Sequence, residues 1–500
     1  GYIPGNANLA QGSARLILNE VSGSLPSQLN GYMEIAGQKA EMVIANPAGI
    51  TCNGCGFINT SRGTLTTGKP LFGNDGALNG FQVDNGQLVI DGLGLNASNT
   101  DRLSLYSRAL VLNAELHAKD LQVVTGVNSI NALTGAATAQ SVSSDVPFFA
   151  IDSSNLGGMY ANRIRLVGTE AGVGMRMAAP VAAMNGNLEI TNNGDVRLAR
   201  SSASSGLNVQ TPGHLELTGA MTSDGSIAMT VGRSLLSSVS VEAGGNLDIQ
   251  ANALQNSGSY LRAEGDLTLK LPDFDRAAIG GNFGADGRFS VLTTNNIVFG
   301  GAEVSTLGAL SLISEAGEIH LDGRVVSGGD TDLRATNIFI GTDGFLTSQR
   351  ALSVSAINLN NLGLLYGRDA LTLQIENILN NGRLALSLPA SLLSDGDIHI
   401  NRVDGGVTAE VNNWGSRIES ITGGIDISAS RIRNINIGWS LDSTLLPTVY
   451  SYSPNQTRWE TYYGIGVSST KNMHAYRYAR TTRDYEIAYG FQGNVVAGGD

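Results

Sequence analysis

Cys52 and Cys55 are the residues of this sequence whose type and spacing most directly suggest chemistry. A Cys-x-x-Cys pair can form a disulfide, carry out redox reactions or supply half of a zinc site. A zinc site needs about four ligands, but there is no other cysteine and the five histidines are scattered. A redox pair normally opens a helix in an α/β fold, whereas this pair lies among glycine, asparagine and strand-forming residues. The pattern favours a short structural disulfide in an exported protein, with two free, buried thiols as the alternative.

Two further segments partly match ligand-binding motifs. Residues 63–69 fit the phosphate-binding loop G-x-x-x-x-G-K, but Pro70 stands where a magnesium-binding hydroxyl and a continuing helix are needed. Residues 280–286 resemble a calcium-binding nonapeptide with the spacing one residue off and no tandem copy. The acidic residues are scattered over the polar positions of repeats, where solvation explains them. We therefore expect no enzyme activity, no metal and no cofactor.

Composition and charge exclude several classes of protein. The 500-residue chain has a formal net charge of −12 and no basic run, so a nucleic-acid partner is not expected. Its 64 glycines, 11 prolines and 42% hydrophobic residues fit neither a disordered chain nor collagen. No apolar stretch approaches the roughly 18 residues that a membrane-spanning helix requires. The composition favours many short strands joined by tight turns.

A five-residue unit, Gly-polar-apolar-polar-apolar, recurs along the chain, with several neighbouring copies about 20 residues apart. Copies begin at Gly186, Gly213, Gly225, Gly245, Gly265, Gly287, Gly308 and Gly396. The alternation places the apolar side chains on one face of a strand, and the glycine permits a turn with positive φ. One such strand cannot bury its apolar face alone, whereas stacked copies form a continuous core. The repeats predict an all-β fold, a right-handed parallel β-helix (solenoid) with ~20-residue coils.

The C-terminal part departs from the repeats because eight of the 14 tyrosines lie between residues 450 and 489. Recognition surfaces favour tyrosine, tryptophan and arginine, but the same aromatic residues could close a hydrophobic hairpin packed on the solenoid. We expect an aromatic-rich β insertion over 431–490 and the start of a further repeat over 491–500, with the natural chain continuing. The candidate recognition residues are Trp439, Trp459, Tyr462, Tyr463, Tyr476, Tyr478 and Tyr485.

Residues 46–59, NPAGITCNGCGFIN, carry a resemblance to a known family. They resemble the second signature of the haemagglutination-activity, or two-partner secretion (TPS), domain of large bacterial exoproteins. The flanking segments 16–21 and 64–68 agree, and the resemblance covers about residues 5–190. The first signature departs from the family pattern because Ala7 replaces its proline, and the residues that usually precede it are absent. The secretion-motif residues carried over are Asn6, Asn8, Leu9, Asn46, Pro47, Ala48, Gly49 and Ile50.

The resemblance implies a TPS domain over 1–190, N-terminally incomplete, followed by filamentous-haemagglutinin-type β-helix repeats over 191–430. It also implies recognition by the periplasmic domains of a cognate outer-membrane transporter (CdiB/TpsB type), secretion across the outer membrane and a location at the cell surface. Within the motif, Asn46 and Asn59 could hydrogen-bond the backbone of a turn. The motif could therefore shape the fold, contact the transporter, or do both.

The paired cysteines look most like the contact-dependent growth inhibition (CdiA-type) branch of this family. That resemblance implies a filament of a single chain that binds a receptor on target bacteria and presents a C-terminal toxin lying beyond Asp500. The alternative within the same secretion pathway is a host-cell adhesin (filamentous haemagglutinin) or a secreted haemolysin.

Overall fold

The computed structural model describes residues 12–435, except 142–145, 259, 302 and 383–389, together with five short strands between residues 450 and 497. Within this part of the chain the elements are strands apart from one short helix, α1 (Arg276–Ile279). The chain divides into two compact units, Gly1–Tyr260 (unit 1) and Leu261–Asp500 (unit 2). None of the described helices is long and apolar enough to cross a membrane.

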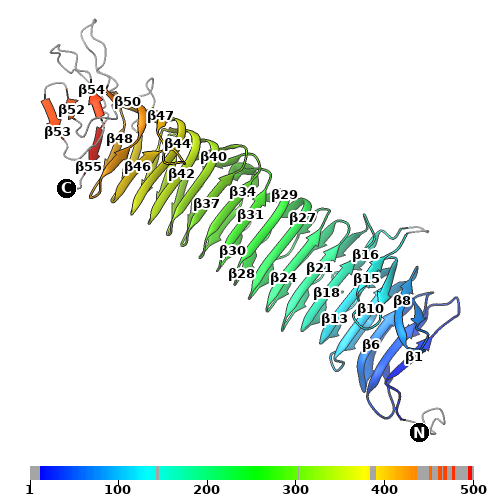
Figure 1. The fold of residues 1–500 in the computed structure, drawn as a ribbon. Coiled ribbons are helices and arrows are strands. Elements are labelled where there is room, and N and C mark those ends of the chain that lie inside the picture. The colour runs from blue at the N-terminus through cyan, green and yellow to red at the C-terminus, as the bar shows by residue number, and fades with distance from the viewer. Residues whose placement is uncertain are drawn as a thin grey trace. The chain divides into compact units, whose positions relative to one another are not determined.

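Unit 1 is a stack of coils in which strands of successive coils pair in parallel along three ladders (Figure 1). The first ladder contains β1 (Leu16–Glu20), β4 (Ala40–Ala45), β6 (Thr60–Thr66), β10 (Arg102–Ser107), β13 (Asp120–Thr125), β18 (Arg163–Gly168), β21 (Asn187–Asn192), β24 (Gly206–Thr211) and the starts of β27 (Ser226–Ser237) and β29 (Leu247–Asn256). The second contains β2 (Ser27–Leu29), the starts of β5 (Ile50–Ile58) and β9 (Gln87–Ala97), β11 (Ala109–Leu112), β16 (Phe149–Ser153), β19 (Gly174–Met177), β22 (Val196–Leu198), β25 (Leu215–Leu217) and the ends of β27 and β29 (Leu247–Asn256). The third contains β3 (Tyr32–Glu34), the ends of β5 and β9, β12 (Leu116–Ala118), β17 (Met159–Ala161), β20 (Val181–Ala183), β23 (Ser201–Ala203), β26 (Met221–Ser223) and β28 (Val241–Ala243).

Unit 2 repeats the same three-ladder arrangement. Its first ladder contains β31 (Leu267–Leu271), β34 (Phe289–Thr293), β37 (Leu310–Ser314), the starts of β40 (Thr331–Ile340), β42 (Ala351–Asn361) and β44 (Ala370–Gly382), β46 (Asp397–Asn401) and β49 (Ile425–Ile427). The second contains β32 (Phe274–Asp275), β35 (Ile297–Gly300), β38 (Glu318–Asp322), the ends of β40, β42 and β44, β47 (Thr408–Trp414) and β50 (Ala429–Ile435). The third contains β30 (Tyr260–Ala263), β33 (Asn282–Ala285), β36 (Val304–Thr306), β39 (Arg324–Ser327), β41 (Phe345–Ser348), β43 (Leu364–Gly367), β45 (Ser391–Ser394), β48 (Arg417–Ser420) and β55 (Asn494–Ala497).

The core follows from the alternation in the repeats. In β21, Leu188 and Ile190 are buried, while Asn187, Glu189 and Thr191, which alternate with them, are exposed. Leu188 lies opposite Leu207 of the next coil, and Leu207 lies opposite Ile227 of the coil after that. Apolar side chains therefore stack in columns inside the coils, and their burial is the main stabilising contribution. The predicted parallel β-helix with coils of about 20 residues is confirmed.

An additional four-stranded antiparallel sheet covers the outside of the first ladder in unit 1. Its order is β15 (Ala137–Ala139), β14 (Asn128–Asn131), β8 (Leu78–Val83) and β7 (Lys69–Phe72). Phe81, Val83 and Ile130 of this sheet pack against outward-facing Tyr106 and Val124 of the first ladder in one buried cluster. The chain leaves the coils twice to build this sheet, which the repeat pattern did not predict.

The short strands near the C-terminus form two hairpin-like pairs. β51 (Tyr450–Tyr452) pairs antiparallel with β54 (Tyr476–Tyr478), and β52 (Glu460–Tyr463) with β53 (Gly466–Ser469). β55 pairs in parallel with β48 of the third ladder. Tyr462, Tyr463, Tyr476 and Tyr478 lie in these strands, whereas Trp439, Trp459 and Tyr485 lie outside the described residues. The domain boundaries at 190, 430 and 490 stay predictions.

Buried asparagines stack along unit 2 in hydrogen-bonded columns. Asn361 Nδ2 donates to Asn381 Oδ1 (2.8 Å), Asn381 Nδ2 to Asn413 Oδ1 (2.8 Å) and Asn413 Nδ2 to Asn434 Oδ1 (2.9 Å). All four side chains are at most 3% exposed. Asn381 and Asn413 both donate and accept along the stack, so neighbouring coils satisfy each other's buried polar atoms. This arrangement favours one register between coils.

A second asparagine column ends on a carboxylate. Asn377, Asn358 and Asn337 pass hydrogen bonds in one direction, and Asn337 Nδ2 donates to Glu318 Oε1 (2.8 Å). Glu318 also lies 2.9 Å from His320 Nε2. The hydrogen bond from Asn337, followed by the one from His320, lowers the pKa of Glu318 below its usual 4.5.

We expect the stability of unit 2 to fall as the pH drops below about 4.5. The lowered folded-state pKa means that the stabilising contribution of Glu318 is fully present above the unfolded-state pKa and is lost as the pH falls through the folded-state pKa. Denaturant unfolding followed between pH 3 and 7 would measure it, and Glu318→Gln should flatten the acid side of the profile. Glu376→Gln, at an exposed carboxylate of the same unit, is the control. Equal flattening by both variants would contradict the assignment.

Candidate functional site

The N-P-A-G-I motif forms the corner between β4 and β5. Asn46 is fully buried. Its Nδ2 donates to the carbonyl of Leu25 (3.0 Å) and to Ser27 Oγ (2.9 Å), and its Oδ1 accepts from the backbone N–H of Ala48 (2.9 Å). As expected, the Asn46 side chain closes a turn at this point. It also ties that turn to the preceding coil.

At the end of the motif region, the side chain of Asn59 also hydrogen-bonds the backbone of the preceding coil. Asn59 has a φ of 56°, the positive range that asparagine tolerates better than most residues. Its Nδ2 donates to the carbonyls of Ile35 and Gly37 in the preceding coil, both at 2.8 Å. Gly49, with a φ of 122°, donates its N–H to the carbonyl of Asn46 (3.0 Å). The polar side chains of both corners therefore serve coil-to-coil contacts within the protein.

The other residues of the N-P-A-G-I motif lie in the same corner and at the start of β5. Pro47 and Ala48 continue the corner, and Ile50 begins β5 with 1% exposure. Asn6, Asn8 and Leu9 of the first signature lie outside the described residues.

Cys52 and Cys55 are both buried in β5 and are joined by a disulfide across a Cα–Cα distance of 5.4 Å. The register between β5 and β9 shifts between Asn53 and Cys55, where β5 passes from the second ladder to the third. Gly54, with a φ of 71°, lies at this corner beneath Leu93. The disulfide therefore closes a corner of the coil. The described residues contain no group of three or more His, Cys, Asp or Glu that could hold a metal ion.

The two weaker motifs form strands. Residues 63–69 run from β6 into β7, and residues 280–286 contain β33.

At the corner that follows β6, the Thr67 hydroxyl donates to the carbonyl of Asn85 (2.6 Å). This contact joins a coil to the loop that leads out of the antiparallel sheet.

A buried ion pair joins two coils to that same loop. Arg108 Nη2 lies 2.9 Å from Glu170 Oε1, and Arg108 Nε donates to Glu170 Oε2 (3.3 Å). The two side chains are only 7% and 2% exposed. Arg108 Nη1 also donates to Asn85 Oδ1 (3.3 Å). The pair therefore links the corner after β10, the corner after β18 and the end of β8.

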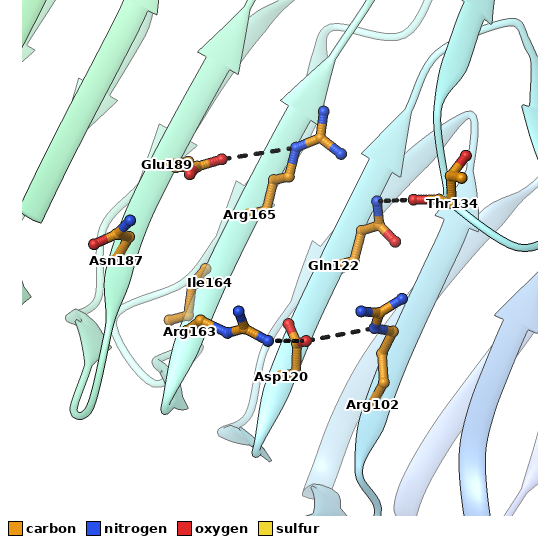
Figure 2. A pocket seen from close by; sticks show the side chains of 9 residues that line it. All are labelled: Arg102, Asp120, Gln122, Thr134, Arg163, Ile164, Arg165, Asn187 and Glu189. Carbon is orange, nitrogen blue, oxygen red and sulfur yellow. Dashed lines mark hydrogen bonds and ion pairs between the residues drawn. The ribbon is translucent and has the colours of Figure 1, made fainter. Parts of the chain in front are cut away.

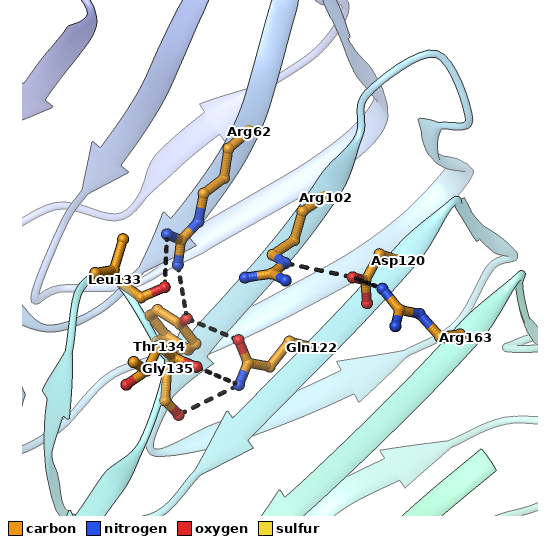
Figure 3. A network of polar contacts seen from close by, with 9 residues as sticks. Arg62, Arg102, Asp120, Gln122, Leu133, Thr134, Gly135 and Arg163 are labelled. Carbon is orange, nitrogen blue, oxygen red and sulfur yellow. Dashed lines mark hydrogen bonds and ion pairs between the residues drawn. The ribbon is translucent and has the colours of Figure 1, made fainter. Parts of the chain in front are cut away.

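A polar network fixes the tip of the β14–β15 hairpin against the first ladder (Figure 3). Arg62 donates from Nη1 to the carbonyl of Leu133 and from Nη2 to Tyr106 Oη, both at 3.3 Å. Tyr106 Oη donates to Gln122 Oε1 (3.1 Å), and Gln122 Nε2 donates to the carbonyl of Gly135 (3.3 Å). Gly135 has a φ of 67°, and a Cβ there would lie 2.2 Å from the Gln122 amide. A glycine is therefore needed at the tip.

Beside the hairpin tip lies a polar groove of about 230 Å³ on the outer face of the first ladder (Figure 2). Its lining comes from four successive strands and the hairpin: Arg102, Asp120, Gln122, Thr134, Arg163, Ile164, Arg165, Asn187 and Glu189. Asp120 Oδ2 accepts from Arg163 Nη2 (2.8 Å) and from Arg102 Nε (3.4 Å). Three guanidinium groups face two carboxylates here, so the groove has a net positive charge in an acidic chain.

Lys39 and Asp101 form an ion pair on the surface of unit 1. The Lys39 ammonium, which donates to Asp101 Oδ2 (2.9 Å), holds the pKa of that carboxyl below its usual range, and Lys119 adds to the effect. The pair is solvent-exposed. We therefore assign it no functional role.

Comparison with known proteins gives consistent matches. Residues 6–198 match the family described as the TPS secretion domain. The 16S rRNA endonuclease CdiA of Enterobacter cloacae is 37% identical over 389 residues, 73% of this chain and 11% of that protein. Toxin CdiA of Yersinia pestis is 46% identical over 227 residues, 44% of this chain and 7% of that protein. The crystal structure of a filamentous hemagglutinin secretion domain is 27% identical and covers 49% of this chain and 78% of that one, with a TM-score of 0.39. The chain thus spans about a tenth or less of the length of the curated relatives.

Proposed function

We propose that residues 1–500 are the export and presentation segment of a growth-inhibition filament. The premise is that this chain belongs to the two-partner secretion family, with CdiA proteins among its relatives. The family places the protein among those exported across the outer membrane to the cell surface with the help of a cognate outer-membrane transporter. The proposal adds that the transporter is of the CdiB type and recognises the TPS domain through its periplasmic domains. It also adds that a toxin outside residues 1–500 is presented to a receptor on neighbouring bacteria.

The observation that carries the proposal is the match of residues 6–198 to the TPS secretion domain. The architecture of unit 1 suits the role. Each coil pairs only with its neighbours, so coils can fold one after another as the chain emerges from a pore. Each added coil buries further apolar area, which favours outward movement without a nucleotide as the energy source. In this proposal the segment itself catalyses no reaction.

The disulfide is compatible with passage through a transporter. It joins residues only three apart in sequence, so an oxidised chain carries a minimal loop. Such a loop is far smaller than one that joins distant coils. We therefore propose that the oxidised chain can be exported.

The test is the export of this chain, placed behind a signal peptide, in Gram-negative cells with and without its cognate transporter. Surface exposure is measured by antibody binding to intact cells and by sensitivity to added protease. We expect exposure only with the transporter, and its loss when residues 12–198 are deleted. A deletion of matching length within unit 2 should keep export. Equal exposure with and without the transporter would refute the proposal.

Asn46→Ala extends this test. Because Asn46 makes three hydrogen bonds within the protein, we expect the variant to lower the yield of folded, surface-exposed chain by destabilising the corner. The matched control is Asn74→Ala, at an exposed turn position of the same unit. Normal thermal stability of Asn46→Ala combined with failed export would instead assign the residue to the transporter contact.

A further inference from the structure

We propose that the groove in Figure 2 binds an acidic sugar residue, a pyranose that carries a carboxylate, on the folded secretion domain. The proposal concerns the protein after folding. It is independent of how the chain is exported.

The arginines supply the recognition of a carboxylate. A guanidinium has five N–H donors, and Asp120 accepts only one from Arg102 and one from Arg163. Arg165 lies 3.9 Å from Glu189, and it makes no hydrogen bond to another residue in the described part of the chain. Donors of Arg163 and Arg165 therefore remain for a ligand, and arginine is well suited to binding a carboxylate at two points. One further carboxylate would balance the charge of the groove.

The other polar groups suit the hydroxyl groups of a sugar. Glu189 flanks Arg165 on the neighbouring strand, at the same register level. Asn187 lies one row away, beside Arg163. Carboxylates accept hydrogen bonds and amides both donate and accept them. A site for a bare anion would have no use for these acceptors.

The groove is held in shape from two sides. Gln122 donates to the carbonyls of Thr134 (3.5 Å) and Gly135 (3.3 Å), which fixes the hairpin tip as a wall (Figure 3). On the opposite side, the aliphatic stem of Arg163 lies over Gly186, where a Cβ would be 2.4 Å from Arg163 Cγ. A rigid site loses less conformational entropy on binding.

Size limits the ligand to one small group. The volume of about 230 Å³ lies below the roughly 300–1,000 Å³ of sites for drug-sized ligands. A single sugar ring with its carboxylate is a suitable occupant, and longer saccharides could extend along the open face. Cross-coil charge pairs alone do not make such a site. The pair formed by Arg197 and Glu216 on β22 and β25 shows the same chemistry without a hairpin wall.

The experiment is a saturation-transfer NMR titration of the purified 500-residue chain with D-glucuronic acid, D-glucose and acetate. We expect saturable binding of glucuronic acid at millimolar concentrations and at least tenfold weaker binding of glucose and of acetate. The double variant Arg163→Gln/Arg165→Gln should weaken glucuronic acid binding at least tenfold, whereas the control Arg197→Gln should not. Thermal unfolding of each variant confirms that the fold is kept.

Three outcomes would overturn the proposal. Equal binding of glucose and glucuronic acid would remove the role of the arginines. Binding of acetate as strong as that of glucuronic acid would reduce the groove to a simple anion site. Absence of saturable binding, or binding that a folded double variant retains, would show that the charges only stabilise the ladder. If the double variant does not fold, Arg165→Lys provides the same comparison with the charge kept and two-point recognition lost.

Discussion

Replacing Glu170 with alanine is expected to lower the free energy of unfolding of unit 1 by about 3–5 kcal/mol, the usual loss when one partner of a buried ion pair is removed. The side chain of Arg108 is 7% exposed and that of Glu170 is 2% exposed. Arg108 also holds Asn85 at the end of the antiparallel sheet. Glu170→Ala would leave a buried guanidinium without its carboxylate partner and loosen the attachment of that sheet.

The measurement is urea unfolding followed by far-UV circular dichroism, combined with hydrogen exchange of β8, β10 and β18. The control is Glu189→Ala, because Glu189 is half-exposed and lies 3.9 Å from Arg165; its loss should stay within about 0.5 kcal/mol. The double variant Arg108→Met/Glu170→Leu should recover much of the stability, since a buried pair can often be replaced by apolar residues. Equal losses for Glu170→Ala and Glu189→Ala would contradict this account.

The coils were predictable from the sequence because each repeat contains the same short pattern of a glycine followed by alternating apolar and polar residues. A residue such as Leu207 follows a glycine and alternates with polar neighbours, and this pattern alone specifies a strand with one buried face. The N-P-A-G-I corner was predictable for a similar reason. Asn46 acts on a turn two residues away, so its role is local in sequence.

The antiparallel sheet was not predicted, although the sequence contains a signal for it. Tyr106 and Val124 occupy outward positions of the first ladder, where the repeats elsewhere place polar residues. A strand that is apolar on both faces is typical of a strand covered on both faces. The Arg108–Glu170 pair has no such signal because 62 residues separate the partners. The excursions that build the sheet interrupt the ~20-residue spacing on which a pairing could be based.

The asparagine column was also missed, and it too is visible in retrospect. The triplets LNN, LNN and VNN at 359–361, 379–381 and 411–413 place an asparagine pair after a buried residue in three successive coils. Sequence alone presents these as turn residues. Stacking brings equivalent positions together, and Asn361, Asn381 and Asn413 then become one column.

The direction of hydrogen bonding in this column leads to the second large effect. Asn381 Nδ2 donates to Asn413 Oδ1 (2.8 Å) and to the carbonyl of Arg417 (3.0 Å), and its Oδ1 accepts from Asn361 (2.8 Å). Asn381→Asp keeps the size of the side chain but turns its donor into an acceptor that faces two acceptors. Because the position is fully buried, we expect a loss of at least about 3 kcal/mol in the stability of unit 2 at neutral pH.

The same change at the exposed end of the second column, Asn377→Asp, provides the control. Asn377 donates to Asn358 Oδ1 at 3.1 Å in an exposed position, where water can replace the lost hydrogen bond, so the loss should stay below about 1 kcal/mol. Denaturant unfolding gives both values, and hydrogen exchange of β42, β44 and β47 shows whether the damage is confined to the coils that share the column. A loss at Asn381 no larger than that at Asn377 would show that register in unit 2 depends on the apolar columns alone. A large, local loss would show that the buried amides select the register in which each new coil of unit 2 adds to the last, since a slip by one residue would bring the inward-facing amides level with residues that face outward.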